Sequence, residues 1–542
     1  MYTRIAFILP LLIAKSVFGQ INPDVQRALT AVSSSEVKSV MSFLADDLLE
    51  GRQPGTRGFA IASKYIQTEL LSIGLKPGVK GSYVQRVPLV KGVVNDRESE
   101  FILESGGTSD TFSYGKDFIM SPYMVEGRSF VTSSLVFAGF GVSAPELGYD
   151  DYKGMDVNGK IVVLLDQAPE TFGNNERAYF SSPAIKYQEA VKRGAIGVIN
   201  LVMSRRTSWE ATVRRSAQGT FKWLDEKGHP NNGFESLKVI ATLNPANAGK
   251  LFNHSGTNID AVYADIKAGK PHSFPLKLSA QLSVSTSISQ VESSNLIGVI
   301  PGSDPTLKGE YIVYVAHLDH FGIGNPVKGD SIYNGAHDNA SGVAILLAIA
   351  RTFQSLPVAP KRSIVIAVVT GEESGLLGSD YFVSNPTVDG PIVANLALDM
   401  PFFFHPISDV VPYGVQHSSL SKQVEEATKI LNLKISTDPF PEQVVFVRSD
   451  HFSFIKKGIP ALFIKSGFMT SQSDTVNRAK SDVAWRTSTY HTPQDDMSQA
   501  FDFDAALTHV RLNFLIGLLV ANEPMRPEWN KGDFFGKKFG KK

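Results

Sequence analysis

From residue 294 onward, short apolar runs typical of buried strands alternate with longer segments that have helical periodicity. The strand-like runs cover residues 311–315, 363–369, 394–398 and 459–464. The helical segments between them include residues 342–354 and 419–431. Strands that alternate with helices predict an α/β fold with a mixed, mainly parallel sheet flanked by helices, and such sheets bind ligands at the carboxyl ends of their strands.

Histidine and acidic residues occupy the ends of these strand-like runs or follow them closely. In chain order they are His317, Asp319, Asp338, Glu372, Glu373 and Asp399. A further histidine, His491, stands in a turn-prone Tyr-His-Thr-Pro segment. Each of these residues alone is typical of a surface pair, a helix cap or a solvated charge. Their recurrence at successive strand ends favours one shared site.

Five of these side chains are candidate metal ligands: His317, Asp338, Glu373, Asp399 and His491. The chain has no cysteine, so a metal site must be built from His, Asp and Glu. Two imidazoles and three carboxylates suit two Zn²⁺ ions if one carboxylate bridges them. Glu372 then remains as a general base. Asp319 shares a strand face with His317, so its carboxylate can orient that imidazole.

The charge balance argues against nucleic acid as a partner. Lys plus Arg and Asp plus Glu both number 53, which gives a formal net charge of zero. Nucleic-acid binding needs a clustered positive field, and this composition provides no support for one.

The N-terminus has the pattern of an export signal. Arg4 precedes an apolar run over residues 5–14, and Gly19 provides a small residue before a cleavage point. We therefore predict a signal peptide over residues 1–19 and a periplasmic or extracellular location. No later run of about 18 apolar residues appears, so no transmembrane segment is expected.

The region before the α/β part divides into further predicted pieces. Residues 20–130 begin with two amphipathic helices and continue as short strands, and we expect them to form the N-terminal part of the α/β domain. Residues 131–285 form a small inserted β-rich unit without a catalytic constellation. Residues 290–525 form the α/β domain. Residues 526–542 are rich in Phe, Gly and Lys, and we predict a solvated tail there.

The same motifs resemble a known family. The segments that carry the resemblance are Ala316-His317-Leu318-Asp319-His320, Asp338-Asn339-Ala340-Ser341-Gly342, Glu372-Glu373-Ser374-Gly375, Leu398-Asp399-Met400 and Tyr490-His491-Thr492-Pro493. Together they resemble the M28 family of two-zinc aminopeptidases and carboxypeptidases. The β-rich unit is similar to the protease-associated (PA) domain inserted in many members. The resemblance implies a zinc-exopeptidase-like fold for the α/β domain.

The resemblance also implies a role for each site residue. His317 and Asp399 would hold one zinc ion, Glu373 and His491 the other, and Asp338 would bridge the two. Glu372 would be the general base and Asp319 the partner of His317. A cis peptide bond is implied between Asp338 and Asn339.

The chain departs from the family pattern in two places. His337 stands where an acidic or amide residue is usual, so it could perturb the bridge or act as a stray ligand. Pro401-Phe402-Phe403-Phe404 stands where a glycine is more usual, which should reshape the wall beside the metals. The expected function is a secreted zinc exopeptidase of the aminopeptidase type that acts on peptides. A carboxypeptidase or dipeptidase of the same fold, or a non-catalytic receptor-like binding protein, remain alternatives.

Overall fold

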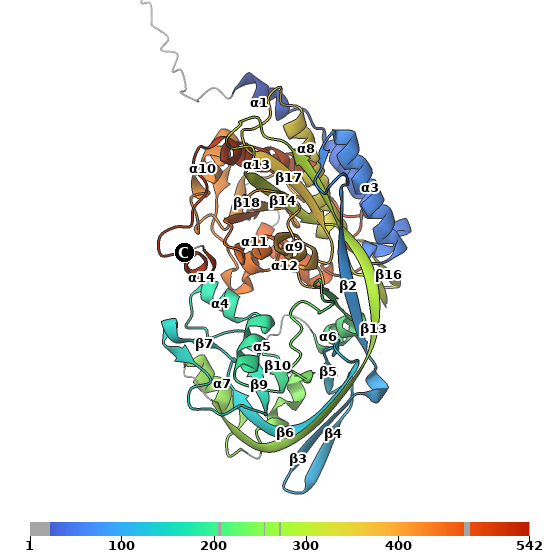
Figure 1. The fold of residues 1–542 in the computed structure, drawn as a ribbon, viewed down its shortest axis with the longest axis vertical. Helices are drawn as coiled ribbons and strands as arrows, with labels where there is room; N and C mark the ends of the chain where they lie inside the picture. The colour runs from blue at the N-terminus through green and yellow to red at the C-terminus, as the bar shows by residue number, and fades with distance from the viewer. Residues whose placement is uncertain (1–21, 204–207, 254, 270–272, 471–476, 541–542) are drawn as a thin grey trace, which may run out of the picture.

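One long strand, β13 (Ser273–Ile300), runs through both sheets of the molecule. It joins a first unit, built on its C-terminal half, to a second unit, built on its N-terminal half (Figure 1). The fold comes from a computed structural model that describes residues 22–203, 208–253, 255–269, 273–470 and 477–540. The predicted signal peptide over residues 1–19, which includes Arg4, lies outside these described residues.

The sheet of the first unit has a parallel centre. Its four central strands lie in the order β17 (Ser363–Val369), β14 (Tyr311–His317), β18 (Ile392–Ala397) and β21 (Ala461–Ser466). Antiparallel strands flank this centre: β13 pairs with β17, and β19 (Asp409–Tyr413) pairs with β21. Beyond them lie β2 (Val84–Val94), antiparallel to β13, and β20 (Lys434–Ile435), parallel to β19. The predicted mixed, mainly parallel α/β fold is confirmed.

Helices cover both faces of this sheet because alternate side chains of each central strand point to opposite faces. Ile312 and Tyr314 of β14 pack into a core with residues of α8 and α13, whereas Val313 and Val315 pack into a core with Phe382 of α9. The first face is covered by α2 (Ser34–Leu44), α3 (Arg57–Ile73), α8 (Ser341–Gln354), α10 (Ser421–Ile430) and α13 (Phe503–Asn522). The second face is covered by α9 (Leu377–Ser384) and α11 (His451–Ile455).

Capping motifs mark the start of helix α2 and the end of helix α3. Ser33 and Glu36 form a capping box at the start of α2, and α3 ends at Gly74, whose φ of 88° suits a residue without a side chain. On α3, Phe59 and Ala62 are buried, whereas Ile61 is 36% exposed.

Helix α13 is the one helix in the described part of the chain that is long and apolar enough to cross a membrane, judged by length and composition alone. In the structure 67% of its most apolar window is buried inside the protein, and it packs against α8, α2 and α10. Burial among other helices explains its apolar composition.

The second unit is a separate layered structure with its own core. Its sheet has the order β5 (Phe118–Met120), β12 (Val239–Leu243), β10 (Gly197–Leu201), β9 (Ile161–Leu165), β6 (Arg128–Ala138), β13, β3 (Glu100–Ser105) and β4 (Thr108–Phe112). Its helices are α4 (Asn174–Phe180), α5 (Pro183–Lys192), α6 (Trp209–Ala217) and α7 (Ile259–Lys267). Its core includes Phe101 and Phe118 as well as later residues, and the predicted boundary at 131 stays a prediction.

Part of the predicted solvated tail packs against the first unit, and Phe535 is its one buried residue among those that the structure describes. The short helix α14 (Phe534–Phe539) buries Phe535 completely against Phe446 and His417, and the Trp529 indole donates a hydrogen bond to the Gly458 carbonyl. The aromatic side chains that made the tail unusual in sequence are what anchors it, because burying them removes a large apolar area from water.

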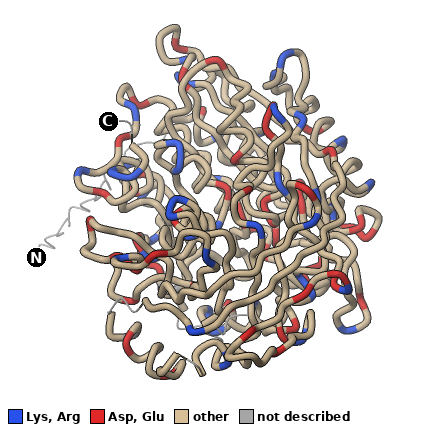
Figure 2. The backbone as a smooth tube through the Cα atoms, turned by 60° about the horizontal axis from the view of Figure 1, so that its bottom comes forward, with Lys and Arg blue, Asp and Glu red and all other residues tan. Residues whose placement is uncertain are grey.

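Basic and acidic residues are interspersed along the backbone in the view of Figure 2, as expected from a chain with equal numbers of each.

Candidate metal centre

The sequence-predicted residues meet at one edge of the first sheet. His317 ends β14, Glu372 and Glu373 follow β17, and Asp399 follows β18. Because β14 lies between β17 and β18 and all three are parallel, their carboxyl ends are adjacent. Asp338 lies in the turn η5 (Ala336–Ala340), directly before α8, and reaches the same edge.

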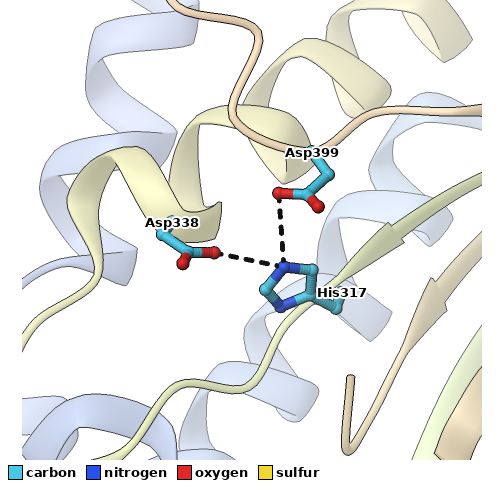
Figure 3. A group of neighbouring side chains, drawn as sticks. All are labelled: His317, Asp338 and Asp399. Carbon is cyan, nitrogen blue, oxygen red and sulfur yellow. Dashed lines mark ion pairs between the residues drawn. The ribbon is translucent and has the colours of Figure 1, made fainter. Parts of the chain in front are cut away.

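Asp338 stands at the middle of the cluster, and its two carboxylate oxygens face different partners. Oδ1 lies 3.3 Å from Nε2 of His317, and that same nitrogen is 3.6 Å from Oδ1 of Asp399. Figure 3 shows both carboxylates pointing at the His317 ring. On the other side, Oδ2 of Asp338 lies 3.1 Å from Nε2 of His491, which is 3.3 Å from Oε2 of Glu373.

Several polar atoms in this cluster are buried without a hydrogen-bond partner. They include Nε2 of His317 and Oδ1 of Asp399. A buried polar atom without a partner is costly, so each such atom in a native fold calls for an explanation. His317, Asp338 and Asp399 offer ligand atoms within 4.8 Å of one another, and these are hard oxygen and imidazole donors of the type that zinc accepts. The residues fit a metal ion.

The close packing of acidic groups shifts their protonation. Burial raises the pKa of Glu372 well above its usual range, and the neighbouring Glu373 and Asp399 carboxylates add to the shift. Burial, reinforced by Asp338, raises the pKa of Glu373 to about 8. Burial opposes a charge on His317, but the carboxylates of Glu372, Asp338 and Asp399 outweigh it and raise the pKa of His317. The site concentrates negative charge that a cation would neutralise.

Asp319 contacts the site through two different groups. Its backbone carbonyl is 3.1 Å from Nδ1 of His317, while its carboxylate is 3.8 Å from that nitrogen. The carboxylate accepts hydrogen bonds from the backbone N–H groups of Glu372 and Glu373 at 3.1 and 3.3 Å. Asp319 therefore fixes the turn that carries the two glutamates, in addition to lying beside the imidazole.

One histidine in the site was missed by the sequence reasoning. His320 is buried, and its Nδ1 lies 2.8 Å from Oε1 of Glu373. With Asp338 and Glu373 it forms a second group whose ligand atoms lie within 4.8 Å of one another. Its place in the strand-end motif, three residues after His317, was the available signal.

Two further residues hold the loops of the site together. The Asp495 carboxylate accepts hydrogen bonds from the backbone N–H groups of His337 and Asp338, each at 2.9 Å. The guanidinium of Arg52, 1% exposed, donates to the carbonyls of Leu318 at 2.9 Å and Gly335 at 3.1 Å. Arg52 thus joins the loop after β14 to the turn that carries Asp338.

The two departures from the family pattern pack against each other. The His337 ring is completely buried in an aromatic cluster, with ring centroids 5.5 Å from Phe402, 5.1 Å from Phe404 and 5.0 Å from Trp485. His337 belongs to neither group of candidate metal ligands found among the described residues. The peptide bond between Asp338 and Asn339 is cis, as the resemblance implied.

A cavity of about 730 Å³ opens over the cluster. Asp338, Glu372, Glu373, Asp399 and His491 line its base. Side chains of α6 from the second unit and of α12 (Arg478–Ser488) line its sides. A cavity of this size is within the ordinary range for small-molecule sites.

Comparison with known proteins relates this chain to peptidases. Residues 295–515 match the model of peptidase family M28. Aminopeptidase NAALADL1 of Mus musculus is 35% identical over 115 residues, which are 20% of this chain and 14% of the relative. Aminopeptidase Y of Saccharomyces cerevisiae is 28% identical over 185 residues, which are 33% of this chain and 32% of the relative. The matched segments thus span less than a third of these relatives.

Among solved structures, an aminopeptidase from Aneurinibacillus sp. strain AM-1 has a similar fold, with a TM-score of 0.53 and 20% identity over 93% of this chain and 97% of the other. The segment matched by the family model contains all the candidate metal ligands and the whole parallel centre of the first sheet. Residues 295–515 are therefore similar to the peptidases of family M28.

Proposed function

We propose that this protein is a zinc-dependent exopeptidase of the aminopeptidase type, which hydrolyses the N-terminal bond of peptides. The observation that carries the proposal is the position of Asp338. One of its oxygens faces His317 and the other faces His491, as a carboxylate shared by two ions would.

The proposed ligands form two sets around this carboxylate. His317 and Asp399 would hold one zinc ion, Glu373 and His491 would hold the other, and Asp338 would serve both. Zinc bound there would supply Lewis-acid polarisation of the scissile carbonyl and a more acidic attacking water. The buried, unpartnered atoms Nε2 of His317 and Oδ1 of Asp399 support this assignment.

Glu372 is the proposed general base. Its carboxylate lies 3.9 Å from Nε2 of His317, at the base of the cavity, and its side chain is 11% exposed. From this position it can accept a proton from the attacking water and return it to the leaving amine. The Asp319 carboxylate accepts hydrogen bonds from the backbone of Glu372 and Glu373, which fixes the position of the proposed base relative to the proposed ligand.

Two alternatives belong to the same site. A carboxypeptidase or dipeptidase would use the same metal ligands but would also bind a free substrate carboxylate. The arginine side chains that line the cavity support this alternative. A receptor-like binding protein would have no use for the ligands and base, all of which are present.

We also propose that the second unit is a PA-like insert that narrows access to the site, and that the protein acts after export. Ser208 and Gln218, at either end of α6, line the cavity, which supports the first point. The N-terminal sequence pattern supports the second. Removal of residues 1–19 would be checked by N-terminal sequencing of protein recovered from the medium or periplasm.

The test combines metal content with turnover on dipeptides that are free, N-blocked or C-blocked. We expect about two zinc ions per chain after reconstitution, and cleavage only of peptides with a free amino terminus. Glu372→Gln should keep the zinc and lose turnover by ~10²–10⁴-fold, because glutamine cannot accept the proton. The matched control is Glu170→Gln, at an exposed glutamate. Zinc content near zero would disprove the enzyme assignment, and near-normal turnover of Glu372→Gln would disprove its role.

A further inference from the structure

Four arginines line the cavity above the candidate metal centre. Arg214 and Arg215 come from α6 of the second unit, Arg448 from the loop before α11, and Arg486 from α12. They arise from three segments that are far apart in the sequence. The same cavity is also lined by the carboxylates of Asp338, Glu372, Glu373 and Asp399.

Three of these arginines have no acidic partner among the residues that the structure describes. Arg486 pairs with Asp482 at 2.9 Å, which offsets its charge. Arg214, Arg215 and Arg448 are exposed and form no ion pair with any residue that the structure describes. Two zinc ions would balance the four lining carboxylates, so the proposed holoenzyme would have a cavity with unbalanced positive charge. Such a cavity attracts and retains anions.

Aromatic side chains place the arginines close to the proposed metal ligand His491. The Phe321 ring lies 4.6 Å from the His491 ring, and the guanidinium carbon of Arg215 lies 5.3 Å from the Phe321 ring. On the other side the Tyr490 ring stacks on His491 at 3.6 Å, and the guanidinium of Arg486 lies 5.8 Å from that ring.

Arg448 lines the same cavity as Arg215, Glu373 and His491. A ligand atom at these guanidinium groups would share one cavity with the scissile bond, within a few residues at ~3.5 Å of extended chain per residue.

We propose that this cavity selects short peptides that carry a carboxylate beyond the scissile bond, bound by Arg215 and Arg448. This inference rests on the proposed function for the position of the scissile bond. Guanidinium groups bind carboxylates through paired, charge-assisted hydrogen bonds, which gives both affinity and orientation. The carboxylate could be the C-terminus of a dipeptide or the side chain of Asp or Glu, since both present the same chemistry.

Three peptides separate these sources in kinetics with the zinc-loaded enzyme. Leu-Gly has a terminal carboxylate, Leu-Gly-amide has none, and Leu-Glu-amide has only a side-chain carboxylate. We expect Leu-Gly or Leu-Glu-amide to have a KM at least ~10-fold below that of Leu-Gly-amide, as one charge-assisted bond would give. Added salt should reduce this difference.

Variants then assign the effect to the arginines. Arg215→Gln and Arg448→Gln should each raise KM for the carboxylate peptide by ~10-fold and leave KM for Leu-Gly-amide unchanged. Arg97→Gln, at an exposed arginine outside the cavity, should change neither. Equal KM values for all three peptides, or equal effects of the variants on charged and amidated peptides, would overturn the inference while leaving the proposed function intact.

If none of the peptides is cleaved, the proposed function fails and the inference is decided by binding. Calorimetry with Leu-Gly, Leu-Gly-amide and Leu-Glu-amide on zinc-loaded Glu372→Gln protein would then be read in the same way. Tighter binding of a carboxylate peptide that Arg215→Gln abolishes would support the arginine role, and equal binding of all three would overturn it.

Discussion

Each unit has a cluster of buried polar groups. The two clusters differ in whether their buried polar atoms have hydrogen-bond partners. In the second unit, the Asp151 carboxylate accepts hydrogen bonds from the backbone N–H groups of Phe140 and Val142, both at 3.0 Å, and from the Tyr149 hydroxyl at 2.8 Å. The nearby ammonium of Lys186 donates to the carbonyl of Leu165 at 2.7 Å.

In the first unit, by contrast, His317 and Asp399 each keep a buried atom without a hydrogen-bond partner. Both clusters are dominated by desolvation: burial raises the pKa of Asp151 to about 7, just as it raises the pKa of Glu373 to about 8. Burial and shifted pKa values therefore do not separate a structural cluster from a functional one. Unpartnered atoms that converge on one point do.

The largest effect that follows from this comparison concerns Asp338. Asp338→Ala removes the one carboxylate that faces both ligand sets, so zinc affinity should fall by more than ~10³-fold, beyond the ~10–100-fold typical of residues that only orient a ligand. The measurement is competition with a chelator. Zinc should raise the melting temperature of the wild-type protein and not that of the variant.

Asp399→Ala is the comparison for that experiment, because the Asp399 carboxylate would bind only one of the two proposed zinc ions. It should lose one zinc ion and keep the other. An equal loss in both variants would contradict the bridging position of Asp338. The double variant of Asp338→Ala with His337→Ala checks whether the neighbouring histidine compensates.

The second effect concerns the satisfied cluster. Asp151→Ala would leave two backbone N–H groups and a hydroxyl buried without an acceptor, so the free energy of unfolding should fall by about 2–4 kcal/mol. Zinc affinity should stay at the wild-type value. Asp151→Asn provides the control, since its amide oxygen can still accept both backbone bonds. Thermal or denaturant unfolding measures the first part, and unchanged stability of Asp151→Ala would erase the distinction between the two clusters.

The smallest effect concerns Asp319, which has features of both clusters. It is completely buried and its carboxylate is satisfied by the backbone of Glu372 and Glu373, yet it lies beside His317. Asp319→Ala should reduce zinc affinity by ~10–100-fold. Asp319→Asn should recover part of that loss by accepting one of the two backbone bonds. A larger loss at Asp319 than at Asp338 would reverse the assigned roles.

The parts of the site that could be predicted are those that the sheet itself positions. His317, Glu373 and Asp399 follow successive parallel strands, and strand ends can be recognised from a buried run followed by polar residues. Their convergence then follows from the topology. Asp338 could also be predicted from the sequence, because it stands directly before the helical segment that became α8.

The remaining parts depend on contacts that sequence patterns do not encode. Arg52 and Asp495 act through backbone groups of distant loops, and no periodicity marks such partners. The arginines of α6 reach the cavity only because the second unit folds over the first. The buried position of Phe535 depends on the surface that receives it, so composition alone favoured a solvated segment.

The strand β13 has a consequence for how this protein can be taken apart. Its 28 residues supply hydrogen-bonded neighbours to both sheets, from β6 and β3 at one end to β2 and β17 at the other. A truncation that deletes the second unit would cut β13 in the middle and would also remove β11 (Thr220–Trp223), which pairs with residues 89–92 of β2. The first unit therefore cannot be separated from the second without breaking a strand that both share. Moving the two units apart to widen the cavity would require β13 to bend.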